Sequence, residues 1–182
     1  EEFISKKDLY YDLSSYALFG NIKKKIDQSP VDNKKVINLL DEFYDNHTMD
    51  ITFVNDALIY LKKIENNLNL QIIILSNLPL RNREEREKSF NNNGLNYPVI
   101  ANFGPKGPAI KEITQEFEKD IFFIDDISTN LLSARESVNN IKTIHYVSDS
   151  RISKLAQTPE GINIRANNWN EIYKYIKNEI NR

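Results

Sequence analysis

The feature that most constrains this fold is a regular alternation of short apolar runs and longer amphipathic stretches through residues 71–182. Runs such as "IIIL" (72–75) and "IFFI" (121–124) contain no polar residue. Continuous apolar runs of this length suit strands that are covered on both faces. Strands that alternate with helices form parallel sheets with right-handed crossovers. The pattern therefore predicts an α/β fold, a three-layer doubly wound parallel sheet.

The individual elements follow from the same pattern and from turn residues. Gly94 ends a charged stretch and marks the end of a helix. Ser128 or Thr129 is a suitable N-cap for the helix that follows "IFFIDD". The predicted strands cover 71–77, 97–102, 121–126, 142–148 and 161–166, and the predicted helices cover 80–94, 107–120, 128–140, 149–157 and 168–180.

The first third of the chain reads differently, because residues 1–69 show helical spacing and no convincing strand. Ser29 and Pro30 form a helix start signal. Apolar residues then recur at i, i+3, i+4 and i+7. We therefore expect a helical cap region over residues 1–60 and an α/β core over residues 61–182. The apolar residues of the clearest helical pattern are Val36, Leu39, Leu40 and Phe43.

Composition excludes several classes of protein. The 182 residues include no cysteine, which rules out disulfides and thiolate metal sites. The formal net charge of −2 provides no overall attraction to nucleic acid or to an anionic membrane. No apolar run approaches the roughly 18–20 residues of a membrane span. We expect a cytoplasmic protein that binds neither nucleic acid nor membrane, and the sequence does not indicate an oligomeric state.

Polar side chains collect where the predicted strands end. Ser76 and Asn77 follow "IIIL", and Asp125 and Asp126 follow "IFFI". Lys106 lies between two Gly-Pro pairs at a predicted helix start. Ligands of open parallel sheets bind beyond the carboxyl ends of the strands. These five residues are therefore the candidate site.

The acidic pair has two interpretations. Asp125 and Asp126 supply the hard oxygen ligands that Mg²⁺ prefers, and a cation between them relieves their repulsion. In the alternative, Asp126 simply begins a turn and caps the next helix. Ser76 likewise either donates to a phosphoryl oxygen or belongs to an ordinary strand-ending turn with Asn77 and Pro79.

Three motifs in this order resemble the second, third and fourth motifs of the haloacid dehalogenase-like (HAD) superfamily. In this chain they are "IIILSN", "GPKGPAIKEI" and "IFFIDDISTN", and the resemblance covers roughly residues 54–182. It implies a Mg²⁺-dependent phosphatase that acts on a small phosphorylated metabolite. By motif, Ser76 would bind the transferring phosphoryl group together with Asn77, Lys106 would neutralise charge, and Asp125 and Asp126 would bind Mg²⁺.

The family's first motif, an apolar strand followed by Asp-x-Asp, is not found in this sequence. Asp8 and Asp12 follow no apolar strand, and their spacing is wrong. The motif carries the nucleophile, and its strand lies between those of the second and fourth motifs. Because the chain begins with Glu1 and its one methionine is Met49, we expect that the first motif lay upstream of Glu1.

Two other interpretations stay open. The chain could be a catalytically inactive relative that binds phosphate or a partner. A response-regulator receiver also combines an acidic pair, a hydroxyl and a lysine, but there the acidic pair follows the first strand and the lysine comes last. Here the acidic pair comes last, which disfavours a receiver.

Overall fold

The apolar runs of residues 72–166 form parallel strands, which are divided between two sheets. The computed structural model describes residues 1–117 and 120–181. Strand β3 (Ile74–Ser76) pairs with β4 (Val99–Ala101), and a second sheet has the order β5-β6-β7. All of these pairs are parallel. The mixed α/β class predicted from the sequence is confirmed, although the strands form two small sheets in place of one.

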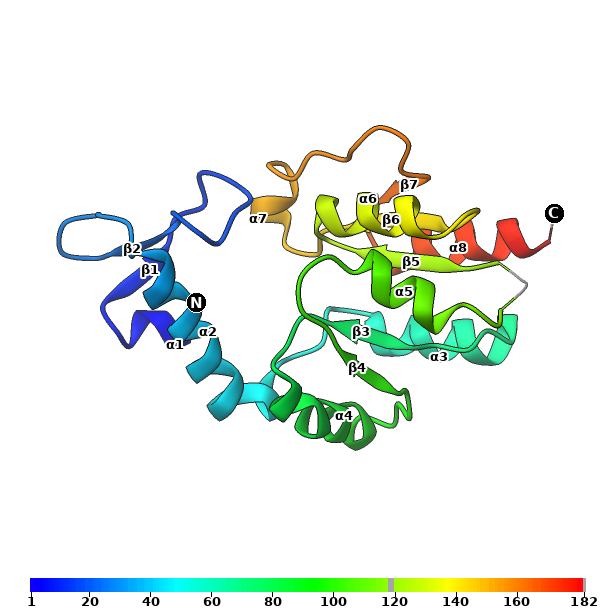
Figure 1. Cartoon of the computed structure of the whole chain (residues 1–182), viewed down its shortest axis with the longest axis horizontal. Coiled ribbons are helices and arrows are strands. Elements are labelled where there is room, and N and C mark those ends of the chain that lie inside the picture. The colour runs from blue at the N-terminus through cyan, green and yellow to red at the C-terminus, as the bar shows by residue number, and fades with distance from the viewer. Residues whose placement is uncertain (118–119, 182) are drawn as a thin grey trace.

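The remaining elements alternate with these strands along the core (Figure 1). The predicted helix over 107–120 is shorter, and its residues 118–119 lie outside the described residues. The core further comprises α3 (Ala57–Leu68), η2 (Leu80–Asn82), α4 (Arg83–Asn92), α5 (Gly107–Ile113), β5 (Phe122–Asp125), α6 (Ser128–Ser137), β6 (Lys142–Tyr146), α7 (Ser150–Ser153), β7 (Ile164–Ala166) and α8 (Trp169–Ile180).

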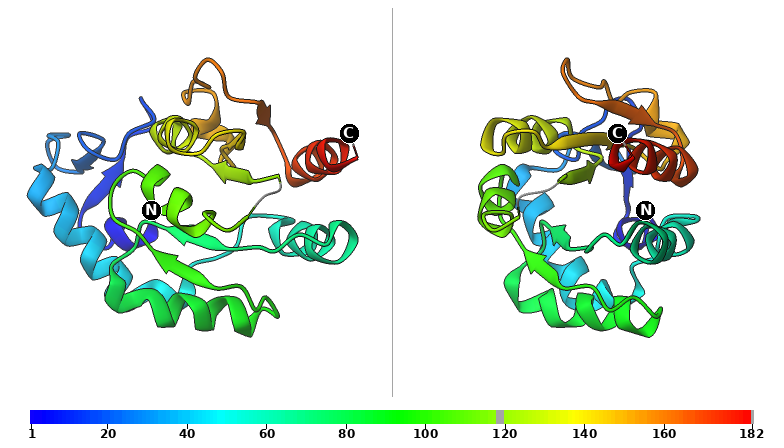
Figure 2. Two further views of the ribbon diagram at one scale, coloured as in Figure 1. Left: turned by 45° about the vertical axis from the view of Figure 1, so that its right-hand side comes forward. Right: turned by 90° about the vertical axis from the view of Figure 1, so that its right-hand side faces the viewer.

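Helices cover the strands on both sides (Figure 2). Alternate residues of β5 face different helical layers, as the pleat of a strand requires. Phe123 packs in a cluster with Ile110 of α5 and Ala134 of α6. Phe122 packs in a different cluster, with residues of α3 and α8. Leu75 of β3 belongs to the first cluster, so the two sheets share their helical layers.

In the described residues, no backbone hydrogen bonds join the edges of β3 and β5 that face each other. The N–H of Ile74 and the C=O of Ser76 bond toward β4, which turns the backbone groups of Leu75 the other way. The C=O of Ile121 bonds to β6, so Phe122 turns its backbone groups away from β6 in the same manner. These apolar strands are only half-buried, whereas the centre of β6 is fully buried.

The N-terminal lobe, residues 1–50, is not purely helical as the sequence predicted. It contains a short antiparallel pair that the sequence analysis missed, because three-residue strands leave too short a pattern. The first long helix begins at Asn33 with Asp32 as its N-cap, not at Ser29-Pro30, because the Asp32 carboxylate accepts from the Lys35 N–H. The lobe comprises α1 (Glu2–Ser5), β1 (Leu9–Tyr11), β2 (Ile22–Lys24), α2 (Asn33–His47) and η1 (Thr48–Asp50).

The lobe has an apolar cluster of its own, which is separate from the clusters of the core. Residues of β1, β2 and α2 form it, with aromatic side chains packed around it. A separate cluster allows the lobe to hold its shape beside the core. Its buried members are Leu9, Ile22, Val31, Val36 and Leu39.

Gly107 sets how closely α5 approaches α6. A Cβ atom built on Gly107 would lie 2.1 Å from the backbone oxygen of Ser133 and 2.4 Å from the Ser137 hydroxyl oxygen. The Gly107 N–H also donates to the Ser133 hydroxyl at 3.1 Å. A side chain is therefore excluded at the start of α5, next to Lys106.

We expect Gly107→Ala to lower the free energy of unfolding by about 1–3 kcal/mol, the usual range for overpacking. The clash is with backbone, so α5 must move. Urea denaturation measures the loss. Gly20→Ala is the control, because a Cβ there meets no atom within 4 Å and only its φ of +83° is strained. A Gly107→Ala protein as stable as the parent would contradict the close approach.

Candidate functional site

The central feature of the candidate site is a buried ion pair between Lys106 and Asp125. The Lys106 ammonium lies 2.7 Å from Oδ2 of Asp125, and their side chains are 13% and 2% exposed. The other carboxylate oxygen, Oδ1, accepts from the backbone N–H of Ile127 at 2.8 Å and from the Asn130 amide at 3.1 Å. Three donors therefore satisfy a buried charge, as burial requires.

Asp126 lies beside this pair but faces other partners. Its Oδ2 accepts a 2.6 Å hydrogen bond from the Tyr16 hydroxyl of the N-terminal lobe. Burial and this bond to Asp126 raise the pKa of Tyr16, so the hydroxyl keeps its proton. The carbonyl oxygen of Asp126 lies 3.1 Å from Nε2 of His145, which is fully buried on β6. Asp126 does not cap α6, which has no side-chain cap bond.

Asn77 connects the end of β3 to the loop that carries Lys106. Its amide donates to the Gly104 carbonyl at 3.0 Å and accepts from the Asn102 amide at 2.7 Å. The Ser76 hydroxyl makes no hydrogen bond within the described part of the chain. Asn77 therefore holds the loop that carries Lys106, and Lys106 in turn pairs with Asp125. The free hydroxyl of Ser76 lies next to Asn77 in the chain.

Several contributors to this site were not found by sequence reasoning. Asn130 lies five residues after Asp125, and its position in the first turn of α6 is the one local signal that could have indicated it. Tyr16 and Asn102 reach the site from distant segments, so no local pattern marks them. His145 is packed within the sheet, between β5 and β7. Trp169, the first residue of α8, contacts two apolar clusters of the core.

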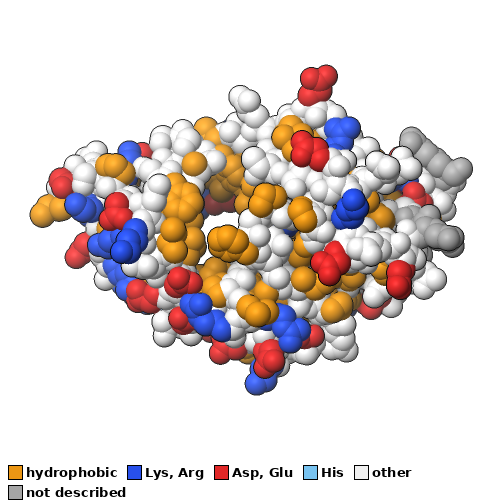
Figure 3. Space-filling model, in the orientation of Figure 1, with side chains coloured by type: hydrophobic (Ala, Val, Ile, Leu, Met, Phe, Trp, Pro, Cys, Tyr) orange, Lys and Arg blue, Asp and Glu red, His pale blue; other side chains and the backbone are white. Residues whose placement is uncertain are grey.

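The N-terminal lobe touches the core on two sides of the site. On one side Arg151 pairs with Glu1 at 3.0 Å. On the other side Arg81 pairs with two aspartates of α2, so it is held by the lobe and is not directed at the candidate site. Between these contacts the surface is hollowed, and hydrophobic side chains border the hollow (Figure 3).

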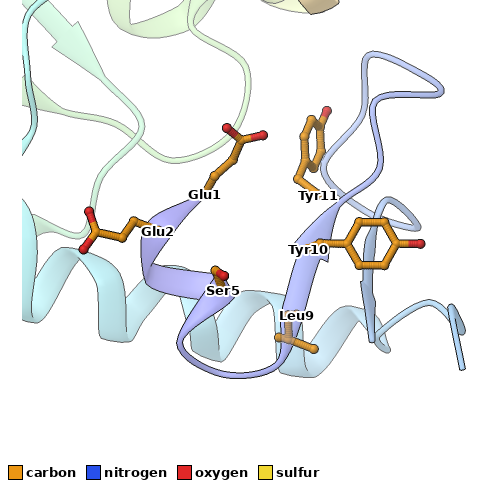
Figure 4. A pocket seen from close by; sticks show the side chains of 6 residues that line it. All are labelled: Glu1, Glu2, Ser5, Leu9, Tyr10 and Tyr11. Carbon is orange, nitrogen blue, oxygen red and sulfur yellow. The ribbon is translucent and has the colours of Figure 1, made fainter. Parts of the chain in front are cut away.

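A pocket beside Glu1 lies apart from the candidate site. Its volume is about 340 Å³, and residues of α1 and β1 line it, with Glu1 and Tyr11 on facing elements (Figure 4). None of the five predicted site residues lines it. An apolar pocket of about 270 Å³ lies between α1, β2 and α2, also within the lobe. Within the described part of the chain, neither pocket is lined by a lysine, an arginine or a histidine.

The site offers a Mg²⁺ ion oxygen ligands of the right kind but few of them. Within residues 1–117 and 120–181, no group of three or more His, Cys, Asp or Glu side chains is arranged to hold a metal. Asp125 already accepts three donors, whereas Asp126 has one side-chain partner, Tyr16. The two carboxylates therefore fit the minimal requirement of a hard cation that also uses water and phosphate oxygens.

Comparisons of the chain with protein-family models, with curated proteins and with solved structures found no match. Across the described residues no helix has the length and apolarity needed to cross a membrane.

We expect Lys106→Met to lower the free energy of unfolding by about 3 kcal/mol, because it leaves the Asp125 charge buried without its cation. Asp125→Asn should lower the free energy of unfolding by less, because the Lys106 ammonium that it leaves unpaired is more exposed and can reach water. In the double variant no unpaired charge remains, so its loss should be smaller than the sum of the two. Chemical denaturation of all four proteins measures the coupling; strictly additive losses would contradict it.

Proposed function

We propose that this chain carries the phosphate- and cation-binding part of a HAD-type phosphatase site, whose substrate is a small phosphorylated metabolite. The observation that carries the proposal is the Lys106–Asp125 pair. It joins a lysine at the start of α5 to the carboxyl end of β5, as the third and fourth motifs require. The free hydroxyl of Ser76, on the neighbouring sheet, supports the second motif.

Each residue then has a role that its surroundings support. The Ser76 hydroxyl would donate to a phosphoryl oxygen, and Asn77 keeps the adjoining loop in place through Gly104. Lys106 would neutralise negative charge on the phosphoryl group. Asp125 and Asp126 would hold Mg²⁺, which supplies electrostatic stabilisation of phosphoryl oxygens when bound.

The nucleophilic aspartate of the proposed reaction is not identified among these residues. The unpaired edges of β3 and β5 support a place for it. A further parallel strand between them would meet the backbone groups of Leu75 on one side and of Phe122 on the other. Its carboxyl end would lie between Ser76 and Asp125, where a nucleophile would reach a phosphoryl group. Such a strand would also join the two sheets into the doubly wound sheet expected from the sequence.

A phosphate- or partner-binding domain without catalysis is the second candidate. The three donors that Asp125 already accepts favour it, because they compete with a cation for this carboxylate. The two candidates differ in the gene: an apolar strand followed by Asp-x-Asp, encoded upstream of Glu1, supports the enzyme. A phosphatase-substrate screen on protein extended to its native start codon then tests turnover directly.

For the chain as printed, we expect orthophosphate to bind more tightly with Mg²⁺ than without it, because the cation screens the two carboxylates from the anion. Isothermal titration calorimetry measures both affinities. We also expect no hydrolysis of an aryl phosphate. Binding that is indifferent to Mg²⁺ would contradict the cation site, and turnover that disappears in Asp125→Asn would show that a nucleophile lies within the chain.

The N-terminal lobe is proposed to act as a lid, because Tyr16 bonds directly to Asp126. Its hydroxyl competes with a cation for the same carboxylate. We expect Tyr16→Phe to tighten Mg²⁺ binding about fivefold, as loss of a competing bond worth about 1 kcal/mol implies. Tyr11→Phe is the matched control, since its hydroxyl bonds to Ala17 in the same loop and not to Asp126. Weaker Mg²⁺ binding by Tyr16→Phe would refute competition.

A further inference from the structure

A buried histidine and a half-buried arginine lie behind the acidic turn of Asp125 and Asp126, and the proposed reaction makes no use of them. His145 is 0% exposed at the centre of the β5-β6-β7 sheet. Arg165 lies on the neighbouring strand β7, in register with it. His145 is a polar group away from solvent and Arg165 is a half-buried charge beside it, so their placement calls for a physical reason.

The hydrogen bonds of His145 identify its protonation state. Nε2 lies 3.1 Å from the carbonyl oxygen of Asp126, and a carbonyl only accepts, so Nε2 carries the proton. Nδ1 lies 2.8 Å from the Thr158 hydroxyl, which can donate to it. Nη1 of Arg165 is 2.9 Å from Nδ1 and 3.3 Å from Nε2. Arg165 lies closer to Nδ1 than to Nε2, so the guanidinium and the Thr158 hydroxyl both hold the ring from the Nδ1 side.

Arg165 has no carboxylate partner within the described residues. Its guanidinium donates to neutral acceptors only, among them the carbonyl of Ala156 at 3.0 Å and the carbonyl of Ser153 at 2.9 Å. Its charge is therefore not cancelled locally. The guanidinium is connected to the acidic turn through His145, which contacts Arg165 on one side and the Asp126 carbonyl on the other.

A second contact ties the same loop to the acidic turn. The Ser128 hydroxyl donates to the carbonyl of Gln157 at 2.8 Å. The segment from Ser153 to Thr158 is thus held by Arg165 and by Ser128. The acidic turn is bonded to the sheet through His145 and to this loop through Ser128.

We propose that Arg165 and His145 are a positioning pair for the acidic turn: Arg165 holds the His145 ring in place from the Nδ1 side, and the His145 Nε2–H fixes the backbone carbonyl of Asp126. The pair touches neither substrate nor cation. It sets where the carboxylates of Asp125 and Asp126 lie relative to each other, and it rests on the proposed function only for its effect on cation binding. Outer partners of this kind typically change metal affinity by about 10–100-fold when removed.

The first test does not depend on the proposed function. Nitrogen-15 NMR of the histidine side chains should show a hydrogen on Nε2 of His145 that is hydrogen-bonded to a carbonyl in the parent chain. In Arg165→Met this hydrogen bond should no longer be held, and amide exchange at Ile127, whose N–H bonds to Asp125, should become at least about tenfold faster. An Nδ1–H tautomer or unchanged Ile127 exchange would overturn the proposal.

The second test measures the affinity of the proposed cation site for Mg²⁺ by calorimetric titration. His145→Met should weaken binding about tenfold or more, whereas His145→Gln, which retains an N–H donor at the corresponding position, should recover most of it. Arg165→Met should resemble His145→Met. Arg151→Met is the charge-matched control, because Arg151 pairs with Glu1 and Asp149 at the surface, and it should change the affinity less than twofold.

The outcomes separate the two ideas. If the parent chain binds no Mg²⁺ while the tautomer and the Ile127 exchange behave as stated, the proposed cation site fails and the positioning pair stands. If His145→Gln and His145→Met weaken Mg²⁺ binding equally, the Nε2–H bond is not what matters and the positioning pair is refuted. Equal losses in Arg165→Met and Arg151→Met would show that only net charge acts.

Discussion

The buried pair of Lys106 and Asp125 is the interaction on which the rest of this site depends. A carboxylate that is 2% exposed must be neutralised or bonded, and Asp125 meets that requirement with an ammonium, a backbone N–H and an amide. The requirement sets the position of α5, because Lys106 can reach Asp125 only where Gly107 lets α5 lie against α6. A glycine with no side-chain role of its own therefore decides whether the charges meet.

The same acidic turn is supported from three directions. Lys106 approaches from the loop after β4, Tyr16 from the N-terminal lobe, and His145 from within the sheet. The three supports differ in kind. Lys106 neutralises a charge and His145 holds the backbone, whereas Tyr16 occupies a carboxylate oxygen that a cation would need. Of the three, only the Tyr16 contact would therefore be lost if the proposed lid opened.

Sequence reasoning succeeded where one pattern governs a whole element. The apolar runs at 72–75 and 121–124 produced strands β3 and β5, and the charged stretch before Gly94 produced α4. It failed where elements are short or depend on distant contacts. Strands β1 and β2 have three residues each, too few for a periodic signal, and the helix expected at Ser29-Pro30 begins three to four residues later because Asp32 provides a better cap.

Taken by itself, the sequence determined which chemical groups stand at the ends of the strands. Local hydrophobic periodicity marks strand ends, so Ser76, Asn77, Asp125 and Asp126 could be identified together. Only the tertiary structure decided which groups meet. The contacts of Asp125 with Lys106, of Asp126 with Tyr16 and of His145 with Arg165 join residues 19, 110 and 20 positions apart. The unpaired edges of β3 and β5 likewise became visible only in three dimensions, because strand order is set by packing between distant segments and leaves no local mark in the sequence.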